Sequence, residues 1–223
     1  MKVIGILSSP HGKKSVTRPL VEAALAGAKE AGAGTELVDV CRLKINYCKG
    51  CHTCYLKGRC PQRDDFQGVL EKVLAADGFV LSSPNYIGNV TAQMKTLMDR
   101  MTDVVHSKLL FDKYGFAVAT AGGAGEESTI RILNDFLARC GAFSTGGVGY
   151  AMSWGPKKAE ETREKARQMG AELAAAIAEK RRFPEQEKAR AESMKLFAYA
   201  VGMNRDLWKH DYDHWVRQGW IKA

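Results

Sequence analysis

The stretch KVIGILSSPHGKKSVT (Lys2–Thr17) passes from a short apolar segment into a loop of small, polar and basic residues. Its apolar part, Lys2–Ser9, has the length and composition of a buried strand. The next segment, Thr17–Ala31, repeats apolar side chains at helical spacing and ends at Gly32, a residue type that commonly follows a helix. The stretch therefore predicts a strand, a loop and a helix in direct succession, which is the repeating unit of a parallel sheet.

The same alternation continues to about residue 182. Further strands are predicted at Thr35–Val40, Phe79–Pro84, Gly115–Thr120 and Phe143–Tyr150. Further helices are predicted from Phe66 to near Asp77, capped by Asp64 and Asp65, at about 91–104, from the AGGAG turn to Cys140, and at 156–182. Five strands joined by helical crossovers predict an α/β fold with a doubly wound, five-stranded parallel sheet.

Three loops rich in small and turn-forming residues follow the first, third and fourth predicted strands: SSPHGKKSVT, SSPNYIGN and TAGGAG. All three lie at the carboxyl edge of the sheet, where ligands of such folds bind. The first combines hydroxyls, a glycine and two lysines at a helix N-terminus, which suits a phosphate, although an ordinary loop capped by Ser15 or Thr17 is an alternative. The second offers Tyr86 to flank a flat ring, and the third allows close backbone approach. Because no Walker A or G-x-G-x-x-G motif is present, ATP or a dinucleotide at the first loop is not expected.

These loops resemble those of the flavodoxin-like NADPH-dependent FMN reductase group over about residues 1–150. The resemblance rests on Ser9-Pro10, the hydroxyls of Ser15 and Thr17, SPNYIGNVTAQMKTLMDR (Ser83–Arg100) and TAGGAG. It implies that FMN phosphate binds at Ser9, His11, Ser15 and Thr17. It also implies that the flavin ring lies against Pro84, Asn85, Tyr86, Ile87, Gly88, Asn89, Ala121, Gly122 and Gly123.

Two positions depart from the family pattern. His11 stands where the family usually has arginine, and Val16 where a small polar residue is common. Since a neutral histidine is a weaker phosphate partner, we expect Lys13 or Lys14 to supply positive charge there.

Four of the six cysteines lie within CKGCHTCYLKGRC (Cys48–Cys60), with the spacing C-x₂-C-x₂-C-x₅-C. A comparable C-x₂-C-x₂-C run ligates [4Fe–4S] clusters, and two glycines would let the loop fold around one. Structural zinc usually takes two more widely separated C-x₂-C pairs, and a redox-active dithiol at Cys48 and Cys51 would leave two cysteines unexplained. Reduced thiols without a metal are a further alternative, whereas disulfides are disfavoured by a reducing compartment. Cys41 and Cys140 are predicted to be small core residues.

A cysteine loop inserted at 42–64 between two flavin-binding segments resembles the iron–sulfur flavoproteins. In that family one chain carries FMN and a [4Fe–4S] cluster, which implies Cys48, Cys51, Cys54 and Cys60 as metal ligands. It also implies electron transfer between a donor such as ferredoxin or NAD(P)H and an acceptor, by homodimers or homotetramers. The alternatives are an NAD(P)H-dependent FMN or quinone reductase whose cysteine loop is structural or zinc-bound, and a non-enzymatic binding module. No catalytic side chain is predicted, because no nucleophile elbow, HExxH motif or triad is evident.

The composition sets wider limits. With 223 residues, 45% of them hydrophobic, the chain is large enough for one α/β core. The net charge of +8 is spread along the chain, and no motif typical of nucleic-acid recognition is present. Nucleic acid is therefore not an expected partner. We see no signal peptide and no apolar run long enough for a bilayer, and we expect a cytoplasmic protein without membrane contact.

The pattern changes after Phe183. Residues 1–183 are predicted to form the flavodoxin-like FMN-binding domain, and 184–223 a helical, aromatic-rich extension with Trp208, Trp215 and Trp220. The extension either contacts another subunit or folds back on its own domain. Trp154 either borders a cofactor or caps the sheet edge, and His52 either bonds to a cluster sulfide or is simply exposed.

Overall fold

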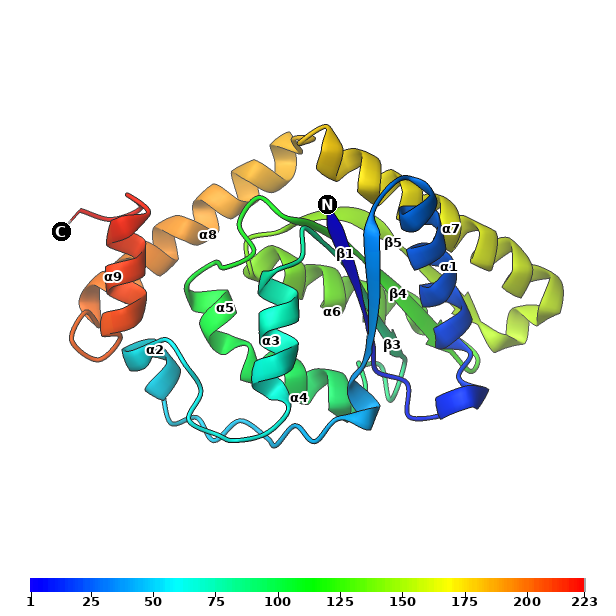
Figure 1. Cartoon of the computed structure of the whole chain (residues 1–223), viewed down its shortest axis with the longest axis horizontal. Helices are drawn as coiled ribbons and strands as arrows, with labels where there is room; N and C mark the ends of the chain where they lie inside the picture. Colours follow the sequence, from blue (N-terminus) through cyan, green and yellow to red (C-terminus); the bar gives the residue numbers. More distant parts are fainter. Residues whose placement is uncertain (223) are drawn as a thin grey trace.

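A computed structural model describes residues 1–222 and contains one parallel sheet with the strand order β2-β1-β3-β4-β5 (Figure 1). The strands are β1 (Lys2–Leu7), β2 (Gly34–Asp39), β3 (Gly78–Pro84), β4 (Tyr114–Ala121) and β5 (Phe143–Ala151). All four strand pairings are parallel. This is the flavodoxin-like order, in which the chain reverses its direction of travel between β1 and β3. The predicted fold class is confirmed.

Helices cover both faces of the sheet. They are α1 (Thr17–Glu30), α2 (Thr53–Lys57), α3 (Phe66–Leu74), α4 (Ala92–Arg100), α5 (Thr102–His106), α6 (Glu126–Arg139), α7 (Gly155–Ala178), α8 (Pro184–Met203) and α9 (Lys209–Arg217). One hydrophobic core lies between the sheet and α3, α4 and α6, and a second lies between the sheet and α1 and α7. Within residues 1–222, none of the helices combines the length and apolar composition needed to cross a bilayer.

The helices α1 and α7 approach each other closely at Gly27 and Gly170. A Cβ atom added to Gly27 would overlap the carbonyl oxygen of Arg167, and one added to Gly170 would overlap that of Ala24. The two glycines thus let the helix backbones touch directly, which fixes the position of α1, whose N-terminus borders the sheet edge.

Three local predictions need correction. The helix expected at 91–104 is divided at Met101, whose N–H group bonds to the carbonyls of both Leu97 and Met98, as at many helix ends. The helix expected to reach 182 ends at Ala178. The cysteine loop contains a short helix, α2, enclosed by His52 and Gly58, which both have positive φ.

Candidate flavin and metal sites

A cavity of about 300 Å³ opens at the carboxyl ends of β1, β3 and β4. Eight of the thirteen residues predicted to bind FMN line it: Ser9, His11, Thr17, Pro84, Asn85, Tyr86, Ala121 and Gly122. Lys14, Val16, Thr120 and Met152 complete the lining. The other five predicted residues, Ser15, Ile87, Gly88, Asn89 and Gly123, are not part of the lining.

The end of the cavity near α1 carries hydroxyl groups. The hydroxyls of Thr17 and Thr120 are 2.7 Å apart and buried. Ser9 is 1% exposed, and its Oγ has no hydrogen-bond partner within residues 1–222. An unpartnered buried hydroxyl beside a helix N-terminus and Lys14 fits a bound phosphate. Ser15 instead accepts a hydrogen bond from the N–H of Arg18 at 3.1 Å, which is the capping role considered from the sequence.

Asn85 fixes the wall formed by the second loop. Its N–H donates to the carbonyl of Thr120 at 2.6 Å, and its side-chain amide donates to the carbonyl of Gly125 at 2.6 Å. These bonds tie the second loop to the third loop. Tyr86 also lines the cavity, with its hydroxyl 3.1 Å from Nε2 of His11, another lining residue.

The residues after Tyr86 form a tight turn rather than a wall. Tyr86 and Asn89 exchange backbone hydrogen bonds, and Ile87 and Gly88 between them both have positive φ. This geometry is that of a two-residue hairpin turn, and it leaves Ile87 fully exposed. Ile87 and Gly88 therefore shape the position of Tyr86 and do not border the cavity.

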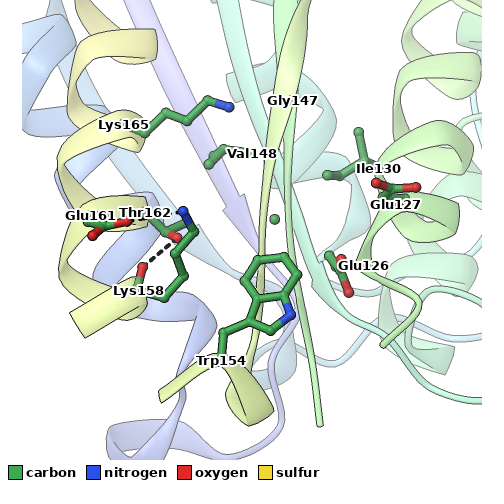
Figure 2. A pocket seen from close by; sticks show the side chains of 11 residues that line it. Glu126, Glu127, Ile130, Gly147, Val148, Trp154, Lys158, Glu161, Thr162 and Lys165 are labelled. Carbon is green, nitrogen blue, oxygen red and sulfur yellow. Dashed lines mark hydrogen bonds and ion pairs between the residues drawn. The ribbon is translucent and has the colours of Figure 1, made fainter. Parts of the chain in front are cut away.

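A separate cavity of about 390 Å³ lies beside the edge strand β5, between α6 and α7 (Figure 2). Trp154 lines this second cavity and not the one at the flavin loops. Ser153, which precedes Trp154, is tied to the third loop: its N–H donates to the carbonyl of Gly122 and its hydroxyl to that of Gly123. Trp154 thus lies at the sheet edge, as one of its two predicted roles requires.

All four loop cysteines line a third cavity, of about 290 Å³. Its other walls come from Lys49, Gly50, His52, Tyr55, Pro61, Gln62, Asp99, Arg100 and Thr102. The N–H of Gly50 lies 3.5 Å from Sγ of Cys48, and the hydroxyl of Thr53 lies 3.4 Å from Sγ of Cys51. The hydrogen bond from Thr53 lowers the pKa of Cys51, whereas burial and the charge of Asp103 raise the pKa of Cys54 to about 12.

The four sulfurs are not gathered into the close arrangement that a single tetrahedral ion requires. Tetrahedral zinc with Zn–S bonds of 2.3 Å places its sulfurs about 3.8 Å apart. Among the described residues, no three cysteine sulfurs lie within 4.8 Å of one another. The four cysteines nevertheless line one cavity and are the residues there that could bind a metal centre through thiolates.

A buried ion pair anchors this loop to α4. The guanidinium of Arg100 contacts both carboxylate oxygens of Asp64, at 2.6 and 3.1 Å, and both side chains are fully buried. Burial acts to raise the pKa of Asp64, but the bonds from Arg100 and from the N–H groups of Asn46 and Phe66 outweigh it, so the pKa is lowered. Arg100 also donates to the carbonyl of Asn46 and lines the cysteine cavity.

The flavin-loop cavity and the cysteine cavity lie at opposite ends of α4. Thr91, its N-cap, bonds to the carbonyl of Ser8 beside the first cavity. Asp99 and Arg100 at its other end line the second cavity. A helix of nine residues is roughly 13 Å long, and this length indicates how far apart the two cavities lie within one chain.

The aromatic extension folds back onto its own chain next to the cysteine loop. Trp215 is fully buried and donates to the carbonyl of His106 at 2.8 Å. Trp208 packs edge-on against Tyr55 and His106. His52 is exposed, with its ring stacked on Tyr55 at 5.3 Å. Of the remaining cysteines, Cys140 is buried in the core as predicted, while Cys41 is only partly buried.

Known proteins share both the sequence and the fold. The family model for NADPH-dependent FMN reductases matches residues 1–157. An iron–sulfur flavoprotein of Archaeoglobus fulgidus is 36% identical over 225 aligned positions, which cover 99% of this chain and 100% of the relative. An iron–sulfur flavoprotein of Methanocaldococcus jannaschii is 40% identical over 139 positions, covering 61% of this chain and 72% of the relative.

Solved structures support the fold. A flavone reductase superposes with a TM-score of 0.63 at 22% identity, covering 80% of this chain and 63% of the other. An NAD(P)H:quinone oxidoreductase from Methanothermobacter marburgensis gives 0.61 at 21% identity, covering 78% and 98%. Together with the family match and the full-length relative, these likenesses show that the chain belongs to the NADPH-dependent FMN reductase family and, within it, to the iron–sulfur flavoproteins.

Proposed function

We propose that this FMN-binding oxidoreductase also carries a [4Fe–4S] cluster at Cys48, Cys51, Cys54 and Cys60 and transfers electrons between a reduced donor and an acceptor. When bound, FMN exchanges one or two electrons and a [4Fe–4S] cluster one at a time, so the pair connects two-electron chemistry to one-electron partners. The observation that carries the proposal is the placement of a four-cysteine cavity and a flavin-loop cavity at the two ends of α4.

Residues of this chain provide the shape and the positive charge of both sites. Thr17, Ser9 and the N-terminus of α1 would bind the FMN phosphate, while Pro84, Tyr86, Ala121 and Gly122 would border the flavin ring. All thirteen residues predicted from the sequence remain candidates, with those outside the lining acting through the loop shape.

At the cysteine cavity, the donors are a hydroxyl and a backbone amide. Thr53 would donate to the thiolate of Cys51 and Gly50 to that of Cys48. The buried guanidinium of Arg100 brings positive charge to the same cavity. Hydrogen bonds and charge around the sulfurs are the means by which a protein tunes such a centre.

The redox partners, the cellular location, the domain division and the oligomeric state are also part of the proposal. We infer ferredoxin or NAD(P)H as the donor and a quinone or another electron carrier as the acceptor. We place the protein in the cytoplasm, where six free cysteines stay reduced. Residues 1–183 would act as the FMN-binding domain, with 184–223 as its extension. A row of exposed apolar side chains on and after α8 supports a homodimer or homotetramer: Leu196, Tyr199, Met203 and Leu207.

Anaerobic purification tests the two-centre proposal directly. We expect about four irons, about four sulfides and about one FMN per chain, with flavin bands over a broad cluster absorption in the visible spectrum. FMN without iron would contradict the cluster and favour an NAD(P)H-dependent FMN or quinone reductase. The absence of FMN would contradict the flavin site itself.

Ser9→Ala tests the phosphate end of the flavin cavity. Because the hydroxyl of Ser9 has no partner within residues 1–222, its removal should spare the fold and weaken FMN binding by roughly 10-fold or more. The measurement is fluorescence titration of flavin-free protein with FMN. Ser8→Ala is the matched control, since that hydroxyl bonds to the carbonyl of Ser82 and should leave FMN affinity unchanged. Equal affinities for both variants would contradict the role of Ser9.

A further inference from the structure

A compact group of acidic and imidazole side chains joins α5 to α9. Asp103 lies on α5, and His210 and Asp211 lie on α9, more than a hundred residues later in the chain. One ligand atom from each residue lies within 4.8 Å of the other two. Asp211 is fully buried and Asp103 is 7% exposed, so two carboxylates are withdrawn from water at one point.

The distances within this group are too long for hydrogen bonds and suit a shared ion. Nδ1 of His210 lies 3.6 Å from Oδ1 of Asp103 and 3.5 Å from Oδ1 of Asp211. Tetrahedral ligands at 2.0–2.2 Å from a metal lie about 3.3–3.6 Å from one another. Within the described chain, both Oδ1 of Asp103 and Nδ1 of His210 are buried without a hydrogen-bond partner. Buried polar atoms in this state generally signal a missing partner.

Neighbouring groups hold the second carboxylate ligand, Asp211, in place. His106 approaches the other oxygen of Asp211, with 3.1 Å between Nδ1 and Oδ2. The hydroxyl of Ser107 donates to Oδ1 of Asp211 at 3.3 Å. Ligating carboxylates are commonly oriented by such outer hydrogen bonds. Oδ1 of Asp103 and Nδ1 of His210 thus remain the atoms without another partner.

We propose that Asp103, His210 and Asp211 bind a divalent first-row transition-metal ion that fastens α9 to α5. The ion neutralises two buried carboxylates and leaves a coordination position for water on the side where His210 is partly exposed. This site is separate from the four cysteines and does not depend on a cluster being bound there.

The proposed ion would also brace the cysteine loop. The ring of Tyr55, next to Cys54, stacks on the ring of His106 at 4.0 Å and 8°. The ring of His210 packs against Gly58, where an added Cβ would lie 2.5 Å from its atoms. The loop therefore rests on two of the histidines around the site.

Without a metal, the interactions of the His210 imidazole with the nearby carboxylates of Asp103 and Asp211 raise its pKa to about 9. At neutral pH, a proton on His210 therefore competes with the metal ion for the imidazole nitrogen. A test must distinguish metal binding from this ion pair.

Manganese is a suitable probe because carboxylates bind it well and thiolates bind it poorly. The full-length protein, incubated with Mn²⁺ and passed through a desalting column, should contain about one first-row ion other than iron per chain by mass spectrometry. Asp103→Asn and His210→Gln should each lose this ion. Asp213→Asn, which changes an exposed carboxylate on the same helix, should retain it.

Thermal unfolding supplies a second measurement. If Asp103, His210 and Asp211 only stabilised the fold, added Mn²⁺ would not change the Tm. Excess Mn²⁺ should raise the Tm of the wild type by roughly 5–10 °C at 100 times the Kd, and should leave the Tm of His210→Gln unchanged. A wild type that holds no metal other than iron and shows no metal-dependent Tm would overturn the proposal. The same holds if Asp103→Asn and His210→Gln retain the ion.

Discussion

Replacing Cys51 by alanine should remove most of the iron from the anaerobically purified protein while FMN stays bound. Cys51 contributes one of the four sulfurs around the cysteine cavity, so its loss leaves the proposed cluster with three protein ligands. None of the cysteines lines the flavin-loop cavity, which lies at the far end of α4. The expected change is from about four irons per chain to below about one, with the FMN content unaltered.

Cys41→Ala is the matched control for this experiment. Cys41 lies shortly after β2, is partly buried and does not border the cysteine cavity. Its replacement should leave both iron and FMN at wild-type levels. Full iron in Cys51→Ala would show that the cluster is held elsewhere, and a joint loss of iron and FMN would show that the two sites are not independent.

Asp64→Ala is expected to give the largest loss of stability among the variants considered, about 3–5 kcal/mol in the free energy of unfolding. The substitution removes the partner of Arg100, whose guanidinium has no exposed surface. It also removes the acceptor for the N–H groups of Asn46 and Phe66. A buried charge without a partner is strongly destabilising, and the same change releases the end of the cysteine loop from α4. Urea unfolding followed by circular dichroism measures the loss.

Asp99→Ala provides the comparison. Asp99 pairs with Lys95 at 2.6 Å on the same helix, but both side chains are about half exposed. Exposed pairs of this kind contribute about 0.2–1 kcal/mol. If Asp64→Ala lost no more stability than Asp99→Ala, the Asp64–Arg100 pair would not be what holds the loop.

The sheet was predictable from the sequence because each strand is an apolar run bounded by loop residues. The carboxyl-edge loops were predictable for the same reason, since parallel strands bring their ends to one edge. Thr120 and Met152 were missed at the flavin cavity. Thr120 ends the fourth predicted strand and begins the TAGGAG loop, and this position could have indicated that it faces the ligand edge.

Contacts between distant segments were the part that the sequence did not disclose. Asp64 was predicted as a helix cap, and it does accept the N–H of Phe66, but its pairing with Arg100 depends on how α4 docks against the loop. Likewise, no periodicity relates Asp103 to His210, because helices α5 and α9 meet only after the extension has folded back. Local patterns specify elements, whereas such pairs are fixed by tertiary packing.

The position of α4 between two cavities also restricts how the chain length can vary. Each residue turns a helix by about 100°, so one inserted or deleted residue within α4 would swing Arg100 away from Asp64 while Thr91 stays bonded to Ser8. The contacts at its two ends therefore fix the number of residues in α4, which acts as a spacer of fixed length.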